Sequence, residues 1–306
     1  MRAGAARIAV VDAARPAETR DAGPFVSVVM VVYRTGEALG ESLGRVLACA
    51  EVSELVIVDN GSTADEAARL AAIQVADPRV RLISGHGNVG FARGANLGAR
   101  AATGELLVFL NPDAFLEAGC VAALTTALTG RREPALVGGR ILNPDRSEQR
   151  GGRRGEITPF SALLSMSGLA RRPALARHEV HWEDRALPSE PAATPTVSGA
   201  CFAMRRATFL EMGGFDEGYF LHVEDIDLCW RVRRAGGEVV FAPAAQAVHV
   251  GGTSRTSPLK VEFHKGVGLA RFFRKQARGG LQKVVAWMLT PLVIVVAVGR
   301  PLVRAR

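Results

Sequence analysis

Acidic and imidazole side chains that could do chemistry occur at three places along the chain. Asp113 ends an Asn-Pro-Asp sequence that begins at Asn111, Glu224 and Asp225 stand side by side, and His249 ends an apolar stretch. A carboxylate can hold Mg²⁺ or Mn²⁺, because hard cations prefer oxygen ligands. It can also take the proton of an attacking hydroxyl group. The same residue types cap helices and begin turns, so residue type alone leaves both interpretations open.

A glycine-rich segment, 88–98, is a second candidate for ligand binding. It opens a predicted helix, whose free backbone N–H groups could face a phosphate. The segment lacks the dinucleotide-binding fingerprint, which should directly follow the first strand with G-x-G-x-x-G spacing. Here the first strand leads instead to Tyr-Arg-Thr-Gly at 33–36. By itself, the glycine-rich segment is a weak indication of phosphate binding.

Apolar, Val-rich segments alternate along the chain with segments of helical spacing. The expected strands are 25–33, 54–58, 80–84, 106–110, 197–204 and 238–241. With helices between them, this order predicts right-handed βαβ units, and hence an α/β fold with a mostly parallel central sheet flanked by helices. Ligands of such sheets bind beyond the carboxyl ends of the strands. Asp59, Asn111 and Asp113 fall at that edge.

Composition divides the chain into a leader, a body and a tail. Residues 1–23 are rich in Ala, Arg and Asp and lack the apolar stretch of a secretory signal, so we expect a loose leader. The body covers 24–256. Within it, 143–195 holds clustered arginines and several prolines, which predicts a long insertion, part loop and part short helix, near an acceptor site. The tail, 257–306, is expected to be helical.

The tail concentrates the positive charge of the chain. The formal net charge is +8, but 255–306 holds 11 Lys and Arg against the single acid Glu262. The uncharged run 284–299 follows, with Pro291 interrupting it. As a helix this run would span about 24 Å, short of the ~30 Å hydrocarbon core of a bilayer. Basic residues at both of its ends favour an interfacial or re-entrant segment, while a short tilted span and a core or dimer helix stay open.

These features also exclude several classes of protein. The four cysteines stand far apart without a Cys-x-x-Cys pair, which argues against a disulfide scaffold and against a thiolate zinc site. The basic excess of the tail borders an apolar run and not an aromatic-studded face. We therefore expect the tail to bind an anionic membrane surface, and we expect no nucleic-acid partner.

Five stretches together carry a more specific signal. They are SVVMVVYR (27–34), IVDNGSTADE (57–66), GNVGFARGANLGARAATGELLVFLNPDAFL (87–116), SGACFAMRRATFLEMGGFDEGYFLHVEDIDLCWRVRRAG (198–236) and HVGGTS (249–254). In order and spacing they resemble the family 2 glycosyltransferases of the GT-A fold, especially the rhamnosyltransferase-like branch. The resemblance covers about 25–256. The family's usual Asp-x-Asp is Asn-Pro-Asp here, which keeps the last carboxylate, normally the metal ligand.

The resemblance implies a role for each matching residue. Asp225, in the pair with Glu224, would be the catalytic base, and Asp113 and His249 would ligate Mg²⁺ or Mn²⁺. Asp59 would bind the nucleotide base. The implied donor-binding positions are Val32, Tyr33, Arg34, Asp59, Asn60, Gly90, Arg93, Gly94, Asn96 and Asn111.

The resulting expectation is an inverting, metal-dependent glycosyltransferase. One base and one metal, without an enzyme nucleophile, give a single displacement at the anomeric carbon. The resemblance favours dTDP-L-rhamnose as donor and a glycan or polyprenyl-diphosphate-linked acceptor, in cell-envelope polysaccharide synthesis at the cytoplasmic face of the plasma membrane. A UDP-sugar donor and a catalytically silent sugar-nucleotide-binding assembly subunit are the alternatives. The sequence leaves the oligomeric state open.

Overall fold

The computed structural model describes residues 24–254 and 256–304, so the predicted leader at 1–23 lies outside the described residues. A nine-stranded sheet runs through the centre in the order β3-β2-β1-β4-β10-β6-β11-β5, with β8 paired to β11. The strands of this sheet are β1 Val26–Val32, β2 Val52–Asp59, β3 Val80–Ile83, β4 Leu106–Leu110, β5 Ala114–Leu116, β6 Ala135–Leu142, β8 Ala192–Ala193, β10 Cys201–Arg205 and β11 Glu238–His249. Two short strands, β7 Arg153–Arg154 and β9 Thr196–Val197, form a separate ribbon.

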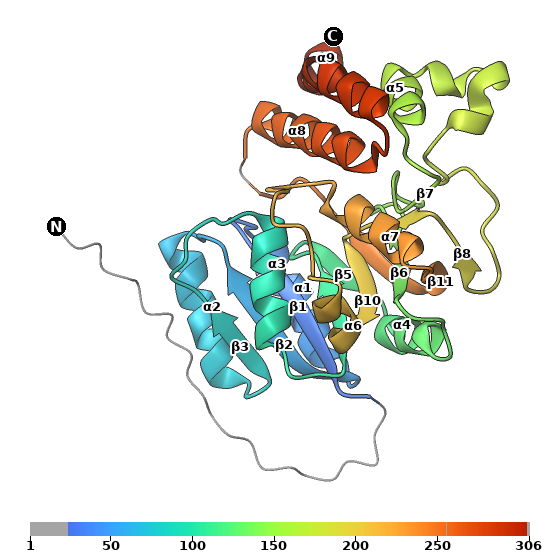
Figure 1. Cartoon of the computed structure of the whole chain (residues 1–306). Coiled ribbons are helices and arrows are strands. Elements are labelled where there is room, and N and C mark those ends of the chain that lie inside the picture. Colours follow the sequence, from blue (N-terminus) through green and yellow to red (C-terminus); the bar gives the residue numbers. More distant parts are fainter. Residues whose placement is uncertain (1–23, 255, 305–306) are drawn as a thin grey trace.

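Helices cover the sheet and extend beyond one end of it (Figure 1). They are α1 Ala38–Ala48, α2 Ala64–Ala76, α3 Phe91–Ala101, α4 Cys120–Leu128, α5 Pro159–Ser167, α6 Arg206–Glu211, α7 Glu224–Arg234, α8 Pro258–Gln276 and α9 Gly280–Arg304, with 3₁₀ turns at Leu169–Arg171 and Pro173–His178. The expected α/β fold with a central sheet and flanking helices is confirmed.

The sheet is mixed, where we expected it to be mostly parallel. Strands β3, β2, β1 and β4 run parallel, and β6 and β11 form a second parallel pair. Strand β10 runs antiparallel to both β4 and β6. The reason is the path of the chain: β6 ends at the carboxyl edge of the sheet, and β10 begins at that edge and runs back. Most of the insertion 143–195 lies near this edge, although its last strand, β8, pairs near the start of β11. The insertion therefore lies beside the strand ends where we expected ligands to bind.

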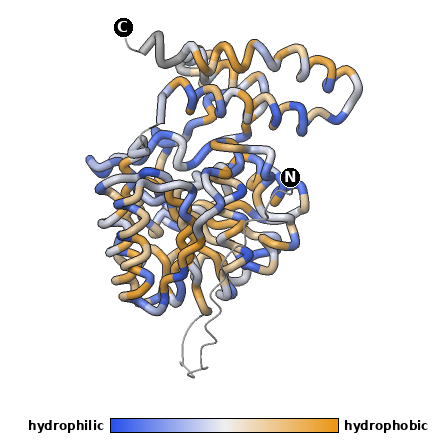
Figure 2. The backbone as a smooth tube through the Cα atoms, turned by 90° about the vertical axis from the view of Figure 1, so that its left-hand side faces the viewer, coloured by the Kyte–Doolittle hydropathy of each residue, from blue (hydrophilic) through white to orange (hydrophobic). Residues whose placement is uncertain are grey.

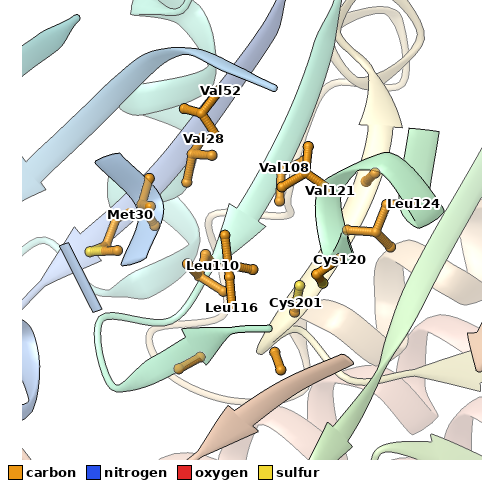
Figure 3. Close-up of a cluster of buried hydrophobic side chains, with 14 of the residues drawn as sticks. Val28, Met30, Val52, Val108, Leu110, Leu116, Cys120, Val121, Leu124 and Cys201 are labelled. Atoms are coloured by element: carbon orange, nitrogen blue, oxygen red, sulfur yellow. The ribbon is translucent and has the colours of Figure 1, made fainter. Parts of the chain in front are cut away.

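The first strand shows why this sequence forms a central strand. All seven residues of β1 are buried, because helices cover both faces of the sheet. Val28 and Met30 point into one cluster, shared with α1 and α4, which Figure 3 shows. Val29 and Val31 point into the other cluster, shared with α3. Helix α3 lies so close to β1 that a Cβ atom at Gly98 would be 2.5 Å from Val29.

The C-terminal segment is helical, as expected, and consists of α8 and α9. Helix α8 packs into the second core cluster through Leu269, Phe272 and Phe273, so it is part of the body and not a free tail. Helix α9 folds back on α8, and Figures 1 and 2 show this pair at one end of the molecule. We expected Pro291 to interrupt the apolar run, but α9 continues through it.

One helix among the described residues is long and apolar enough to cross a membrane. The segment Gly280–Gly299 of α9 has a mean hydropathy of 2.0, and 11% of it is buried. Figure 2 shows its apolar residues along the outer end of the molecule. By length and composition alone this is weak evidence for a membrane span.

Candidate active site

The expected site residues come together at the carboxyl edge of the sheet, where β1, β2 and β4 end. Val32 pairs with Asp59 across the last rung of β1 and β2. Strand β4 ends directly before Asn111, whose backbone N–H donates to the carbonyl of Ala200. The chain steps from β3 back to β4 on the other side of β1, so this edge contains the topological switch point at which ligands of open α/β sheets bind.

Asp113 and His249 form one cluster at this edge. Their backbones are adjacent because β5 pairs antiparallel with β11, which ends at His249. The Asp113 Oδ1 atom lies 3.1 Å from His249 Nε2, and Oδ2 accepts a 2.9 Å hydrogen bond from Thr253. The Asn111 amide nitrogen lies 3.3 Å from the same Nε2 atom. The structure thus brings together the Asn-Pro-Asp sequence 111–113 and His249, which are more than a hundred residues apart in the chain.

Gln149 fixes the tautomer of this histidine. Its amide nitrogen donates to the backbone carbonyl of His249 at 2.9 Å, and its Oε1 atom lies 2.7 Å from His249 Nδ1. Because that oxygen can only accept, Nδ1 carries a proton, and Nε2 is the ring nitrogen that faces Asp113. Without a metal, a proton on Nε2 can be donated to the Asp113 carboxylate. A divalent cation can take the place of that proton and bind the Nε2 lone pair and the carboxylate oxygen, so the donor set suits a divalent metal ion.

Burial and hydrogen bonding have opposite effects on the pKa of Asp113. Burial raises its pKa, but the hydrogen bonds and charge of His249 together with the Thr253 hydroxyl outweigh burial, so the pKa lies below its usual value. Asp113 is therefore a carboxylate at neutral pH. No group of three or more His, Cys, Asp or Glu residues in the described part of the chain could hold a metal. A metal held by Asp113 and His249 would need further oxygen ligands, which a diphosphate can supply.

Glu224 and Asp225 begin helix α7 at the same edge. The Asp225 Oδ2 atom accepts a 3.1 Å hydrogen bond from the Gly199 N–H and lies 3.5 Å from Arg154 Nη2. Glu224 is 7% exposed, and its buried Oε2 atom has no hydrogen-bond partner in the described structure. Burial, together with the neighbouring charge of Asp225, raises the pKa of Glu224 to about 8. The pair thus consists of a carboxyl that holds its proton and a more exposed neighbour.

The backbone directly before this pair is strained. His222 and Val223 have φ angles of 66° and 76°, in the left-handed region that β-branched residues rarely adopt. The following residues nevertheless form a regular helix. Strain of this kind persists only where surrounding packing holds it, and it is common beside functional groups.

A cavity of about 430 Å³ joins the two clusters. Asn111 and His249 line it on one side, and Glu224 and Asp225 line it as well. The insertion contributes much of the remaining wall, and α8 closes it. Residues from these two segments that line the cavity are Gln149, Arg150, Gly151, Arg154, Ile157, Ala162, Ser165, Val180, His181, Lys265 and Leu269. The insertion therefore lies at the site, as its sequence indicated.

Asp59 sits at the end of β2, where a nucleotide base was expected. It is buried, and its Oδ1 atom accepts from the N–H groups of Gly61 and Ser62 at 3.0 and 2.8 Å. These bonds hold the loop after β2. Its Oδ2 atom accepts no hydrogen bond within the described chain, which leaves one carboxylate oxygen for a ligand.

Asn60 and Gly90 connect this loop to the glycine-rich segment. The Asn60 amide donates to the Gly90 carbonyl at 2.9 Å, and its oxygen lies 3.0 Å from His86 Nε2. The Arg34 guanidinium lies 5.3 Å from the centre of the Tyr33 ring at the end of β1. Tyr33, Arg34, Asp59 and Asn60 thus surround the same strand ends.

Three of the expected donor residues have other partners. Asn96 is buried, and its side chain holds the loop before α7 through both backbone groups of Phe215, at 2.8 and 2.9 Å. Arg93 faces outward and pairs with Glu217 at 3.7 Å. A Cβ atom at Gly94 would be 3.0 Å from Val31, so this glycine allows α3 to approach the sheet. These contacts give all three residues roles in the fold.

Sequence reasoning missed Gln149, Thr253 and Arg154 as site residues. Thr253 lies within the HVGGTS stretch, so the motif contained a signal for it. Arg154 belongs to the arginine cluster of the insertion, which indicated charge but not its place beside Asp225. Nothing in the sequence around Gln149 marks it as the partner of a histidine a hundred residues away.

The chain is similar to known proteins over most of its length. The model of "Glycosyl transferase family 2" matches residues 27–213. The chain is 30% identical over 246 residues to the N-acetylglucosaminyl-diphospho-decaprenol L-rhamnosyltransferase of Mycobacterium tuberculosis, covering 72% of this chain and 75% of that protein.

Two solved structures share the fold. The mannosyltransferase PcManGT from Pyrobaculum calidifontis, in complex with GDP-Man and Mn²⁺, is similar with a TM-score of 0.58 and 18% identity, over 92% of this chain and 76% of that one. GalNAc-T7 with UDP, GalNAc and Mn²⁺ gives 0.57 and 19% over 85% of this chain, which spans about half of that structure, 53%. The family match covers more than half of the sequence, and the whole body adopts the fold. The chain therefore belongs to glycosyl transferase family 2, and within that family it is similar to the rhamnosyltransferases.

Proposed function

We propose that this glycosyltransferase moves a sugar from a nucleotide-diphosphate donor to a hydroxyl group of a polyprenyl-diphosphate-linked acceptor, with inversion at the anomeric carbon. One observation carries the proposal: Asp225, Asn111 and His249 line a single cavity at the carboxyl edge of the sheet. The proposed base and one residue of the metal-binding pair, His249, therefore line one space, in which the acceptor hydroxyl and the donor diphosphate can meet.

Asp225 acts as the general base. The Gly199 N–H and the nearby Arg154 guanidinium fix the direction of its Oδ2 atom. A carboxylate held in this way takes the proton of the acceptor hydroxyl as its oxygen attacks the anomeric carbon. The bond between that carbon and the donor diphosphate breaks in the same displacement, so the configuration at the carbon inverts.

Asp113 and His249 would hold Mg²⁺ or Mn²⁺ on the donor diphosphate. The ion supplies Lewis-acid stabilisation of the negative charge that develops on the leaving diphosphate. Asp59, with Tyr33 and Arg34 nearby, binds the nucleoside at the ends of β1 and β2. The similarity to an L-rhamnosyltransferase supports dTDP-L-rhamnose as donor, with a UDP-sugar as the alternative.

Helices α8 and α9 bring the enzyme to an anionic membrane at its cytoplasmic face. Exposed apolar side chains cover α9, among them Trp287, Met288 and Val295, and exposed basic residues accompany them at Lys260 and Lys283. Apolar burial and attraction to anionic lipids act together on such a surface. A lipid-linked acceptor and a membrane-bound enzyme suit a role in cell-envelope polysaccharide synthesis.

The Asp225→Asn variant tests the proposal. Transfer from dTDP-L-rhamnose to a short-chain prenyl-diphosphate-linked N-acetylglucosamine should fall by about 10² to 10⁴-fold. Protection of the variant by the donor against thermal unfolding should persist. Asp184→Asn removes a charge from an exposed position of the insertion and should leave both measurements unchanged. More than a tenth of wild-type turnover in Asp225→Asn would refute the assignment of the base, and donor binding without any turnover in the wild type would favour an assembly subunit.

A further inference from the structure

Three cationic side chains gather on the insertion side of the cavity. Arg150 and Arg154 come from the insertion, Lys265 comes from α8, and all three line the cavity beside His181. Burial, followed by the charges of Arg150 and Arg154, lowers the pKa of His181 to about 3, although the charge of Glu179 opposes this. Like charges that crowd one wall repel each other, so a bound anion would stabilise this arrangement.

Arg154 connects this wall to the base. Its backbone is fixed, because it pairs with Thr196 in the β7–β9 ribbon and bridges to His181. Its guanidinium lies 3.5 Å from Asp225 Oδ2, which is too long for a strong hydrogen bond. The side chain is therefore near the base without being locked to it, and it can turn to an anion in the cavity.

Arg150 is more firmly held. It pairs with Glu183 at 2.9 Å and with Glu179 at 3.6 Å. Neither of these glutamates lines the cavity, so they steady the guanidinium from behind it. Among the acids that do line the cavity, Glu224 holds its proton at neutral pH, because its pKa is raised to about 8. The side chains that line the cavity thus carry more positive than negative charge, and Lys265 also lies 3.9 Å from Glu262 of α8.

The rest of this wall is apolar. Ile157, Ala162 and Val180 of the insertion and Leu269 of α8 are buried and line the cavity. Helix α5 follows Ile157 and, like α8, packs against α9. Most of the exposed large apolar side chains of the described chain lie on α5, α8 and α9, which Figure 1 shows together at one end of the molecule. A path from the cations toward this apolar end suits a ligand with a charged head and a hydrocarbon chain.

We propose that Arg154, Lys265 and Arg150 bind the diphosphate of the acceptor, and that its first isoprene units lie against Ile157, Val180 and Leu269. This inference rests on the proposed function. Because Arg154 contacts both the base and the diphosphate site, the reacting hydroxyl belongs to the sugar that is joined directly to the diphosphate. The enzyme then acts on the first sugar of a lipid-linked chain, and not on the end of a long glycan.

Binding of farnesyl diphosphate to the full chain, measured by calorimetry with EDTA present, tests this site. EDTA removes any metal bridge, so the cations alone must hold the diphosphate. Arg154→Gln and Lys265→Gln should each weaken binding about tenfold, as expected for loss of one charge-assisted contact. Arg177→Gln removes an exposed charge of the insertion outside the cavity and should bind like the wild type. Farnesol, which lacks the diphosphate, should bind much more weakly.

Binding of dTDP with Mn²⁺ distinguishes a site for the diphosphate of the donor from a site for the diphosphate of the acceptor. Both cavity variants should keep it, which also shows that they are folded. If the wild type binds dTDP with Mn²⁺ but not farnesyl diphosphate, the acceptor site is refuted and the proposed function stands. If the variants lose dTDP and not farnesyl diphosphate, the cations serve the donor. If the wild type binds neither dTDP nor a nucleotide sugar, the proposed function itself fails.

Discussion

Replacing Glu224 by glutamine should remove a pH dependence from the stability of the protein. The carboxyl is 7% exposed, its Oε2 atom lacks a partner in the described structure, and Asp225 follows it. Burial and the charge of Asp225 raise its pKa from 4.5 to about 8. Folding therefore forces this carboxyl to keep a proton that it would lose in the unfolded chain at neutral pH.

The sign and the size of the effect follow from this difference. Between pH 4.5 and 8 the folded state binds one more proton than the unfolded state, so the free energy of unfolding falls as the pH rises through this window. The slope is at most about 1.4 kcal/mol per pH unit, which gives ~5 kcal/mol over the whole window. Below pH 4.5 both states are protonated, and above pH 8 both are ionised, so the effect levels off at both ends.

Urea unfolding at a series of pH values from 4 to 9 would measure this pH dependence of the free energy of unfolding. The difference in stability between Glu224→Gln and wild type should grow in favour of the variant as the pH rises, because glutamine carries no proton to lose. Glu211→Gln, at an exposed position, should follow the wild type. Asp225→Asn should shrink the window without closing it, since burial is the larger cause. Parallel curves for Glu224→Gln and wild type would refute the reasoning, because they would mean that Glu224 is ionised in the folded protein.

Two further predictions concern the metal and the membrane. Asp113→Ala should weaken Mn²⁺-dependent binding of dTDP, measured by calorimetry. Gln149→Leu removes the hydrogen-bond partner of His249 Nδ1 and should weaken this binding about 10- to 100-fold. Affinities for dTDP that are equal with and without EDTA would mean that no metal bridge exists. Deleting 281–306, most of α9, should release the protein from anionic vesicles even at low salt, because apolar burial is lost. Reversing the exposed charges of Arg278 and Lys283 should leave a salt-insensitive bound fraction; a full chain that ignores such vesicles would contradict the membrane role.

Local patterns predicted the elements whose burial is uniform or periodic. The continuous apolar run of β1 and the helical spacing of apolar residues in α1 needed no tertiary information. Strand β6 was missed, because Gly138 and Gly139 lie within it and glycine usually weakens a strand. The structure supplies the reason: Val197 packs over Gly138, and the Ala245 carbonyl approaches Gly139 closely. A strand built around such contacts has no signature in its own residues.

The candidate site shows a similar division. Motifs selected Asp113, Asp225 and His249 as candidates, because each lies close to the end of a recognisable strand or helix. They could not give side-chain direction, so Asn96 was expected at the donor although it holds the Phe215 loop. Arg154 comes from an insertion whose place is set only by tertiary folding. The spacing of residues in the sequence therefore could not predict that Arg154 lies close to Asp225.

Two basic residues of α8 form ion pairs with the body of the protein. The basic residues of α8 suggested a membrane-binding face, but Lys275 pairs with the buried Asp227 at 2.7 Å and with Asp216 at 2.9 Å. Arg271 also pairs with Asp216. Burial alone would raise the pKa of Asp216, yet the hydrogen bonds of Lys275 and Arg271 lower it to about 2. These cations therefore dock α8 onto the body and are not free to bind lipid.

This docking also reaches the backbone directly before Glu224 and Asp225. Helix α8 approaches the strained residues so closely that a Cβ atom at Gly268 would lie 3.0 Å from Val223 and 3.2 Å from the His222 carbonyl. Left-handed backbone at non-glycine residues costs about 1–3 kcal/mol each and needs support from its surroundings. Because α8 supplies that support, it helps to hold the start of α7 where Asp225 faces the cavity. The helix that α9 packs against thus also lines the cavity, which places any membrane contact of α9 one helix away from the proposed base, Asp225.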